Sequence, residues 1–111
     1  MLDKAVTWIP SMDVYEMDEN YILDAELPGV ARRSIKVEFS GLEVTIRGER
    51  KIESDCGNER YHMLEGHRGR FHRTFLLPEP VDRNRIRVDL KDGILHIVLP
   101  KSRSQAARGD R

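Results

Sequence analysis

The sequence predicts an all-β protein, an antiparallel β-sandwich of seven to eight short strands. Apolar and polar residues alternate along several short segments, and turn-forming residues separate these segments at regular spacing. No stretch shows the 3.6-residue period of an amphipathic helix. With 111 residues, the chain has the length of one domain with a modest core.

Alternation in the first half of the chain predicts four strands, at residues 11–16, 21–27, 35–39 and 42–47. Pro28-Gly29 is expected to end the second strand, because proline lacks an N–H for the ladder and glycine lets the chain reverse. Ser40-Gly41 is a turn candidate between the third and fourth strands. Gly48 is expected to end the fourth strand.

The second half of the chain predicts four further strands, at residues 60–64, 70–77, 86–90 and 94–99. Asp92-Gly93 separates the last two strands and favours the tight turn of a β-hairpin, because Gly93 tolerates a positive φ. The register of this hairpin commits Ile86, Val88 and Leu90 to one face of the sheet.

A long polar connection runs from Glu49 to Gly69 between the two halves. Connections of this length are uncommon in compact domains and are usually functional or disordered. The short strand within it, residues 60–64, has no neighbour in its own sheet with which it must pair. This strand is therefore a candidate for pairing with another copy of the chain.

Arg73 lies between Phe71 and Phe75 on the side of the predicted strand that faces the core. A buried guanidinium needs a carboxylate or carbonyl partner, because an unpaired buried charge is costly. With Arg68 and Arg70, the same rings also resemble the basic and aromatic surface of a single-strand nucleic-acid binder. Strand parity favours the first interpretation, because it turns both rings inward.

The charge balance argues against polyanionic partners. Charged residues make up 34% of the chain, and 19 basic residues balance 19 acidic ones. A neutral chain has no overall field that attracts nucleic acid or an anionic membrane, whereas neutrality makes self-association easier. No apolar run reaches the roughly 18 residues of a membrane span, and the N-terminus lacks a signal-peptide pattern. We therefore expect neither nucleic acid nor a membrane as a partner.

The single cysteine, Cys56, excludes an internal disulfide framework and fits a reducing compartment. A cytoplasmic location is therefore expected. Cys56 lies in a polar segment, residues 54–58, and is interpreted as an exposed thiol.

No pattern in the sequence is typical of an enzyme or a cofactor-binding protein. The serines lack a nucleophile-elbow motif, and the chain contains neither a phosphate-binding P-loop nor a dinucleotide fingerprint. Histidines lie at positions 62, 67, 72 and 96, a spacing that matches no metal-binding motif. We expect no catalytic residues, no cofactor and no metal.

Several segments together resemble the α-crystallin domain of small heat-shock proteins, in particular bacterial and plant members. The matching segments are Trp-Ile-Pro at residues 8–10, Met-Asp-Val-Tyr-Glu at 12–16, Ala-Glu-Leu-Pro-Gly-Val at 25–30, Val-Thr-Ile-Arg-Gly-Glu-Arg at 44–50, Gly-Arg-Phe-His-Arg-Thr-Phe-Leu-Leu-Pro at 69–78 and Asp-Gly-Ile-Leu at 92–95. We expect a lead-in at residues 1–10, the domain at 11–101, and a disordered polar tail at 102–111.

The resemblance implies an immunoglobulin-like sandwich that acts as an ATP-independent holdase, which binds unfolding proteins through apolar surface and prevents their aggregation. In the bacterial and plant branch, a strand from the long loop pairs with the first strand of the partner subunit. That role falls here on residues 60–64 and on residues 11–14 of the other chain, and Arg73 matches an arginine that helps hold the dimer. The implied dimer interface comprises Met12, Val14, Arg60, Tyr61, His62, Met63, Leu64 and Arg73.

The resemblance also implies a groove at the sandwich edge that receives an Ile-x-Ile motif from a neighbour's tail. Its residues are Ile35, Val37, Phe39, Ile86, Val88 and Leu90. Burial of one aliphatic anchor contributes roughly 1.5–3 kcal/mol, so two anchors would bind weakly and reversibly. The alternative interpretation is that these side chains simply fill the core.

The chain departs from the family pattern at both ends. Only residues 1–10 precede the expected domain, and no Ile-x-Ile or Val-x-Ile follows Lys101. Both elements drive assembly beyond the dimer in the family. A homodimer formed by strand exchange is expected here, and larger homo-oligomers stay open. Two other functions stay open at this point, a co-chaperone-like adaptor that docks on a larger chaperone and a small enzyme.

Overall fold

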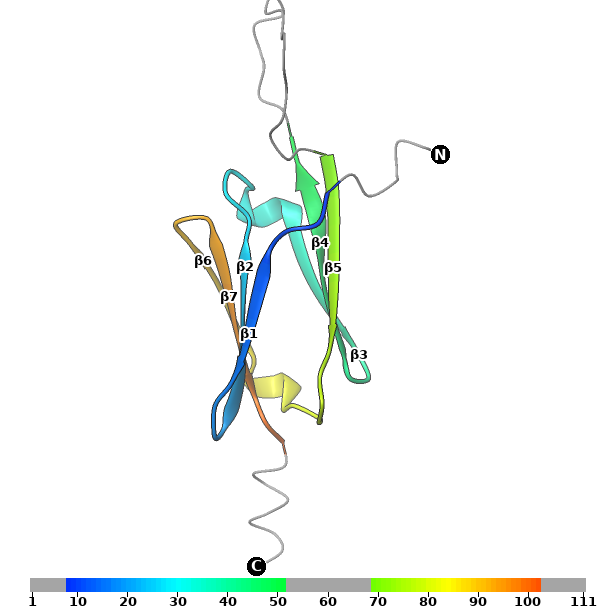
Figure 1. The fold of residues 1–111 in the computed structure, drawn as a ribbon, viewed down its shortest axis with the longest axis vertical. Coiled ribbons are helices and arrows are strands. Elements are labelled where there is room, and N and C mark those ends of the chain that lie inside the picture. The colour runs from blue at the N-terminus through cyan, green and yellow to red at the C-terminus, as the bar shows by residue number, and fades with distance from the viewer. Residues whose placement is uncertain (1–7, 52–68, 103–111) are drawn as a thin grey trace, which may run out of the picture.

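The computed structural model describes residues 8–51 and 69–102 (Figure 1). Two antiparallel sheets face each other across a shared core, as the alternation predicts. The strands of the described residues are β1 (Met12–Glu16), β2 (Asn20–Glu26), β3 (Ile35–Ser40), β4 (Glu43–Arg50), β5 (Gly69–Leu76), β6 (Arg87–Lys91) and β7 (Ile94–Pro100). Two short 3-10 turns, η2 (Arg32–Ser34) and η3 (Arg83–Arg85), connect the sheets. The predicted strand at residues 60–64 lies outside the described residues.

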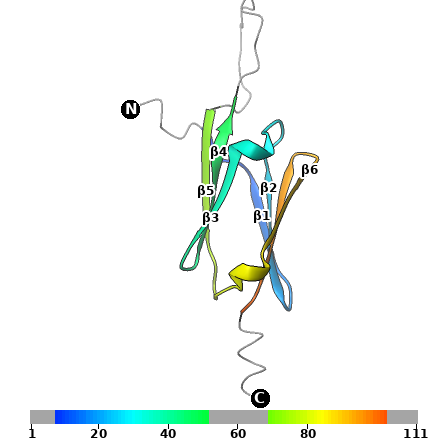
Figure 2. The same ribbon diagram turned by 180° about the vertical axis from the view of Figure 1, so that it is seen from behind.

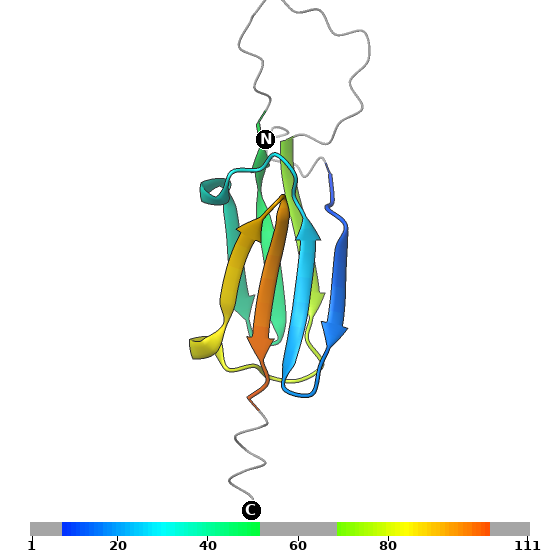
Figure 3. The same cartoon turned by 90° about the vertical axis from the view of Figure 1, so that its left-hand side faces the viewer.

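One sheet has the strand order β1-β2-β7-β6, and the other has the order β3-β4-β5. Figure 3 shows the four-stranded sheet lying in front of the three-stranded one. The chain crosses from one sheet to the other after β2, through η2, and again after β5, through η3. These crossings bring β2 beside β7, although the two strands are far apart in the sequence.

The core lies between the sheets and is built from the inward positions of the alternating strands. Its fully buried members include Leu23 and Ala25 of β2, Ile46 of β4, and Leu95 and Ile97 of β7. Each sheet has one face that packs on the core and one face that contacts water. The alternation of apolar and polar residues along each strand follows from this packing. No helical segment in the described parts of the chain is long and apolar enough to cross a bilayer.

The predicted hairpin turn is confirmed by its backbone angles. Asp92 has a φ of 54° and Gly93 a φ of 78°, and the turn pairs Lys91 with Ile94. Gly93 also accepts a hydrogen bond at its carbonyl from the Leu27 N–H at 2.7 Å. The β6–β7 turn is therefore tied to the end of β2.

Most strand boundaries differ by one residue from the sequence-based ones. Leu42 belongs to the β3–β4 turn, where Gly41 has a φ of 61°, and β4 begins one residue later. Ile86 precedes β6, because η3 ends immediately before it. The prediction that Gly48 ends the fourth strand was wrong, since β4 continues through Gly48 to Arg50.

Gly48 is a packing position rather than a strand stop. It pairs with Phe71 of β5 and with Ile35 of β3. A Cβ at this position would lie 2.1 Å from the Ser34 carbonyl oxygen and 2.8 Å from Cζ of Phe71. Glycine therefore lets the Phe71 ring and the η2 backbone close over β4.

Gly48→Ala is expected to destabilise the fold by about 2–3 kcal/mol, because the added methyl group forces the η2 backbone away from β4. Gly41→Ala is the matched control. A Cβ there meets nothing within 4 Å, so only its positive φ costs stability, about 1 kcal/mol. Urea unfolding at a fixed chain concentration measures both variants. Equal decreases in the free energy of unfolding of the two variants would contradict the packing role of Gly48.

Candidate functional site

The two lateral edges of the sandwich differ, and this difference defines the candidate site. On one side, β1 and β5 border the same lateral edge of the two sheets, and residues 8–10 reach from the start of β1 to β5 (Figure 1). The Trp8 indole N–H donates to the Gly69 carbonyl at 3.1 Å, and its ring lies 5.1 Å from the Phe71 ring. The Trp8 backbone N–H donates to the Arg70 carbonyl. This edge is therefore partly closed by the chain itself.

Arg73 stabilises the same bridged edge. Its Nη1 donates to the Pro10 carbonyl at 3.1 Å, and its side chain is half-buried. The prediction that Arg73 finds a carboxylate or carbonyl partner is confirmed. The contact fixes the backbone just before β1, so Arg73 positions the start of that strand.

β1 is the outermost strand of its sheet and pairs with β2 alone among the described strands. Met12 and Val14 are half-buried and pack against the core. On the other face of β1, the Tyr15 hydroxyl donates to Asp24 at 3.0 Å, and this hydrogen bond raises the pKa of Tyr15. Of the predicted dimer-interface residues, Arg60, Tyr61, His62, Met63 and Leu64 lie outside the described residues.

On the opposite side, β3 and β6 are the outermost strands of the two sheets and face each other (Figure 2). The six predicted groove residues lie on these strands or immediately before β6. Five are half-buried and pack against the core from this edge: Val37, Phe39, Ile86, Val88 and Leu90. Ile35 is only 4% exposed and belongs to the core. We call the six side chains together the β3/β6 edge.

Arg83 bridges the two sheets at one end of the β3/β6 edge. Its Nη2 donates to the Gly41 carbonyl at 3.2 Å, and its guanidinium lies 6.0 Å from the centre of the Phe39 ring. The Arg83 guanidinium therefore covers the Phe39 ring from the side of η3. Sequence reasoning missed this contact, because no local pattern links residue 83 to a turn 42 positions away.

Sequence reasoning also missed Lys101, which is 2% exposed at the end of β7. Its Nζ lies 2.6 Å from Glu16 and 3.9 Å from Glu79, and 5.0 Å from the centre of the Tyr21 ring. The Tyr21 hydroxyl donates to Glu79 at 2.8 Å. This cluster ties the end of β7 to the β1–β2 hairpin and to the connection after β5.

Lys101→Ala is expected to lower the free energy of unfolding by about 2 kcal/mol, because it removes the buried stem and the charge together. Lys101→Met keeps the stem and is expected to cost less than about 1 kcal/mol, since the Glu16 carboxylate is half-exposed and can be hydrated. Urea unfolding of both variants at fixed chain concentration separates the contribution of the buried stem from that of the charge. Equal losses in both variants would show that the charge dominates.

The candidate site offers binding surface rather than reactive groups. His96 lies 2.6 Å from Asp24 and His72 is exposed on β5. No group of three or more His, Cys, Asp or Glu side chains within residues 8–51 and 69–102 could hold a metal ion. Cys56, His62 and His67 lie outside the described residues.

Two facing antiparallel sheets with this strand order, and an apolar edge between β3 and β6, define a β-sandwich of the α-crystallin type. The chain belongs to the Hsp20/alpha crystallin family, whose family model matches residues 13–111. Spore protein SP21 of Stigmatella aurantiaca is 42% identical over 94 residues, which are 85% of this chain and 56% of that protein. Small heat shock protein C2 of Rickettsia felis is 35% identical over 100 residues, covering 90% of this chain and 65% of that protein.

Solved structures show the same fold. Heat shock protein 16.0 from Schizosaccharomyces pombe superposes with a TM-score of 0.81 at 32% identity, covering 86% of this chain and 89% of that chain. The hspA structure from Xanthomonas axonopodis gives a TM-score of 0.77 at 37% identity, covering 87% of this chain and 97% of that chain. The chain thus spans 56% and 65% of the length of the two curated relatives, and nearly all of these solved chains.

Proposed function

We propose that this protein is an ATP-independent holdase chaperone, which binds unfolding proteins through apolar surface and prevents their aggregation. The β3/β6 edge carries the proposal, because five apolar side chains on or beside the two outermost strands remain partly exposed. Membership of the Hsp20/alpha crystallin family supports the same function. The proposed activity is binding without catalysis, and the proposed location is the cytoplasm, which a single cysteine fits.

The proposed mechanism is burial of apolar anchors at the β3/β6 edge. An extended segment of a non-native client, or of a neighbour's tail, would lie along β3 and β6, whose outer edges pair with no further strand among the described residues. Each aliphatic anchor contributes roughly 1.5–3 kcal/mol before ordering costs. Two such anchors give binding that is weak enough to be reversed without a nucleotide.

The proposed assembly is a homodimer formed by strand exchange, in which residues 60–64 of one chain add to β1 of the other. The outermost position of β1 supports this arrangement, because its second edge has no strand partner among the described residues. Arg73 supports it indirectly through its hydrogen bond to the Pro10 carbonyl, which holds the start of β1 in place. Larger homo-oligomers built from such dimers are part of the proposal.

A client-aggregation assay tests the holdase function. Light scattering from a heat-unfolded client is expected to fall as the protein approaches a stoichiometric ratio to the client, equally with and without ATP. Persistent scattering at a molar excess of the protein would contradict the proposal, as would suppression that requires ATP. No observation on the described residues favours the adaptor that docks on a larger chaperone.

A further inference from the structure

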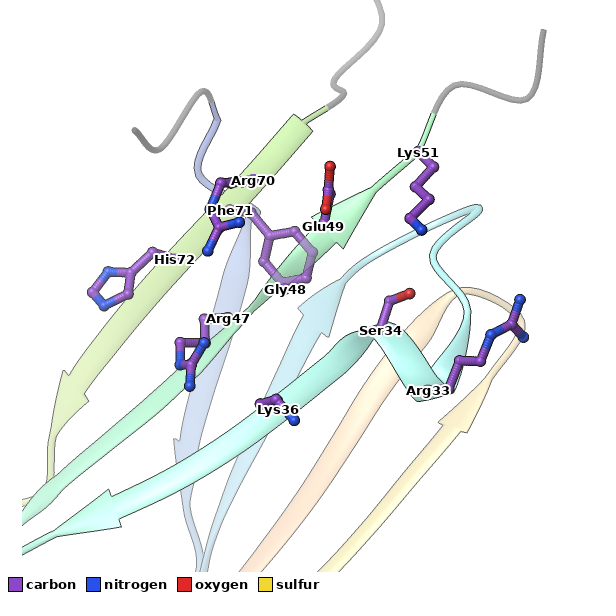
Figure 4. Close-up of a pocket in the computed structure, with 10 residues that line it drawn as sticks. All are labelled: Arg33, Ser34, Lys36, Arg47, Gly48, Glu49, Lys51, Arg70, Phe71 and His72. Atoms are coloured by element: carbon purple, nitrogen blue, oxygen red, sulfur yellow. The ribbon is translucent and has the colours of Figure 1, made fainter. Parts of the chain in front are cut away.

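A basic hollow of about 410 Å³ lies on the outer face of the three-stranded sheet (Figure 4). Five Lys and Arg side chains line it, Arg33, Lys36, Arg47, Lys51 and Arg70, together with the His72 ring. Glu49 is the one carboxylate among the lining residues. This local excess of positive charge contrasts with the chain as a whole, in which 19 basic and 19 acidic residues balance.

Strand register explains why these side chains converge. Lys36 of β3 pairs with Arg47 of β4, and Arg47 pairs with His72 of β5, so the three form one row across the outer face. Figure 4 shows their sticks on the three adjacent strands. Like charges placed directly opposite each other are destabilising in a sheet. Lys36 and Arg47 are like charges placed opposite each other, and the Glu38 carboxylate offsets only part of their repulsion, so an anion bound above the row would add a favourable contact.

Glu38 orients Arg47 within this row. It accepts two hydrogen bonds, from Nε at 3.1 Å and from Nη2 at 2.8 Å, which leaves Nη1 outside this pair. This pairing lowers the pKa of Glu38 and raises the pKa of Arg47, so both groups are charged at neutral pH. Arg33 and Lys51 are exposed and form no ion pair with the described residues. Cationic groups at the rim of the hollow are thus available to a ligand.

The chemistry of the hollow favours phosphate groups over nucleobases. Three of the lining side chains are arginines, whose planar guanidinium groups match phosphate oxygens in a two-pronged geometry. Single-strand nucleic-acid binders also need exposed aromatic rings on which bases stack. The Phe71 side chain that borders the hollow is only 1% exposed, so its ring face is not open to a base.

We infer that this hollow binds a compact ligand that carries several adjacent phosphates, such as a short inorganic polyphosphate. The site is separate from the β3/β6 edge, because alternation turns Lys36 outward where Val37 turns toward the core. Phosphate binding here therefore does not require the holdase activity and can be tested independently of it.

Isothermal titration of the full chain with sodium tripolyphosphate tests the inference. The double variant Arg33→Ala/Lys51→Ala is expected to bind about tenfold more weakly, because two charge-assisted contacts are removed. The control Arg87→Ala/Lys91→Ala removes the same charge from the other sheet and is expected to change the affinity by less than about twofold. Higher salt is expected to weaken binding to the unsubstituted chain.

Three outcomes would overturn the inference. Equal loss of affinity in the two double variants would show that only net charge matters. Orthophosphate that binds as tightly as tripolyphosphate would remove the requirement for adjacent phosphates. Tighter binding to a single-stranded oligonucleotide or to anionic vesicles than to tripolyphosphate would assign the hollow to a different class of partner.

Discussion

Val88→Asp is expected to weaken binding of an Ile-x-Ile peptide by about 10- to 100-fold and to leave the dimer intact. The substitution places a carboxylate among the half-buried side chains of the β3/β6 edge, where Val88 packs from β6. It removes one aliphatic anchor contact, which contributes roughly 1.5–3 kcal/mol. Fluorescence anisotropy with a labelled peptide measures the affinity, and sedimentation measures the mass.

Arg87→Asp is the matched control for this experiment. Arg87 is the neighbouring residue of β6, but its side chain is exposed on the outer face of the sheet. The Arg87→Asp substitution introduces the same residue as Val88→Asp with a larger change in charge. Retained peptide affinity in the Arg87→Asp variant would therefore exclude a charge effect. Val37→Ser on the facing strand provides a second test with a smaller risk of unfolding. Full peptide affinity in both Val88→Asp and Val37→Ser would eliminate the proposed groove.

Replacement of residues 60–64 by Gly-Ser-Gly-Ser-Gly is expected to convert the dimer into a monomer. The replacement keeps the length of the connection between β4 and β5 but removes the apolar and β-forming side chains of the proposed exchanged strand. Without that strand, the second edge of β1 loses its proposed partner. Sedimentation equilibrium at several chain concentrations measures the mass directly.

The same replacement at residues 53–57, which are already polar, is the control and is expected to leave the dimer unchanged. A surviving dimer in the 60–64 variant would refute strand exchange. Loss of the dimer in both variants would instead attribute dimerisation to the connection as a whole. Neither result depends on chaperone activity, so the assembly proposal and the holdase proposal are tested separately.

The fold was predictable because its signal is local. Alternation with a period of two marks every strand of the described residues, and Asp92-Gly93 specifies a turn whose positive φ angles the structure confirms. Gly48 shows where this reasoning fails. A glycine within a strand is read as a stop, but here it makes room for Phe71, a neighbour 23 positions further along the chain.

The candidate site was predictable in its apolar part and not in its polar part. Strand parity placed Ile86, Val88 and Leu90 on one face, and all three pack against the core from that face, because parity needs only the sequence. The capping contact of Arg83 with Phe39 depends on how η3 lies against the β3–β4 turn. The structural role of a charged side chain such as Arg83 can be recognised only when its contact partner is known.

The sequence by itself determined the all-β class, the hairpin turns, the family and the inward set of each strand, since each follows from residue type and spacing along the chain. Only the tertiary structure decided that one edge is bridged by residues 8–10, that Lys101 is buried among carboxylates, and that basic residues line one hollow. The physical reason is distance along the chain. Crossovers between the sheets, rather than local alternation, bring these distant residues into contact.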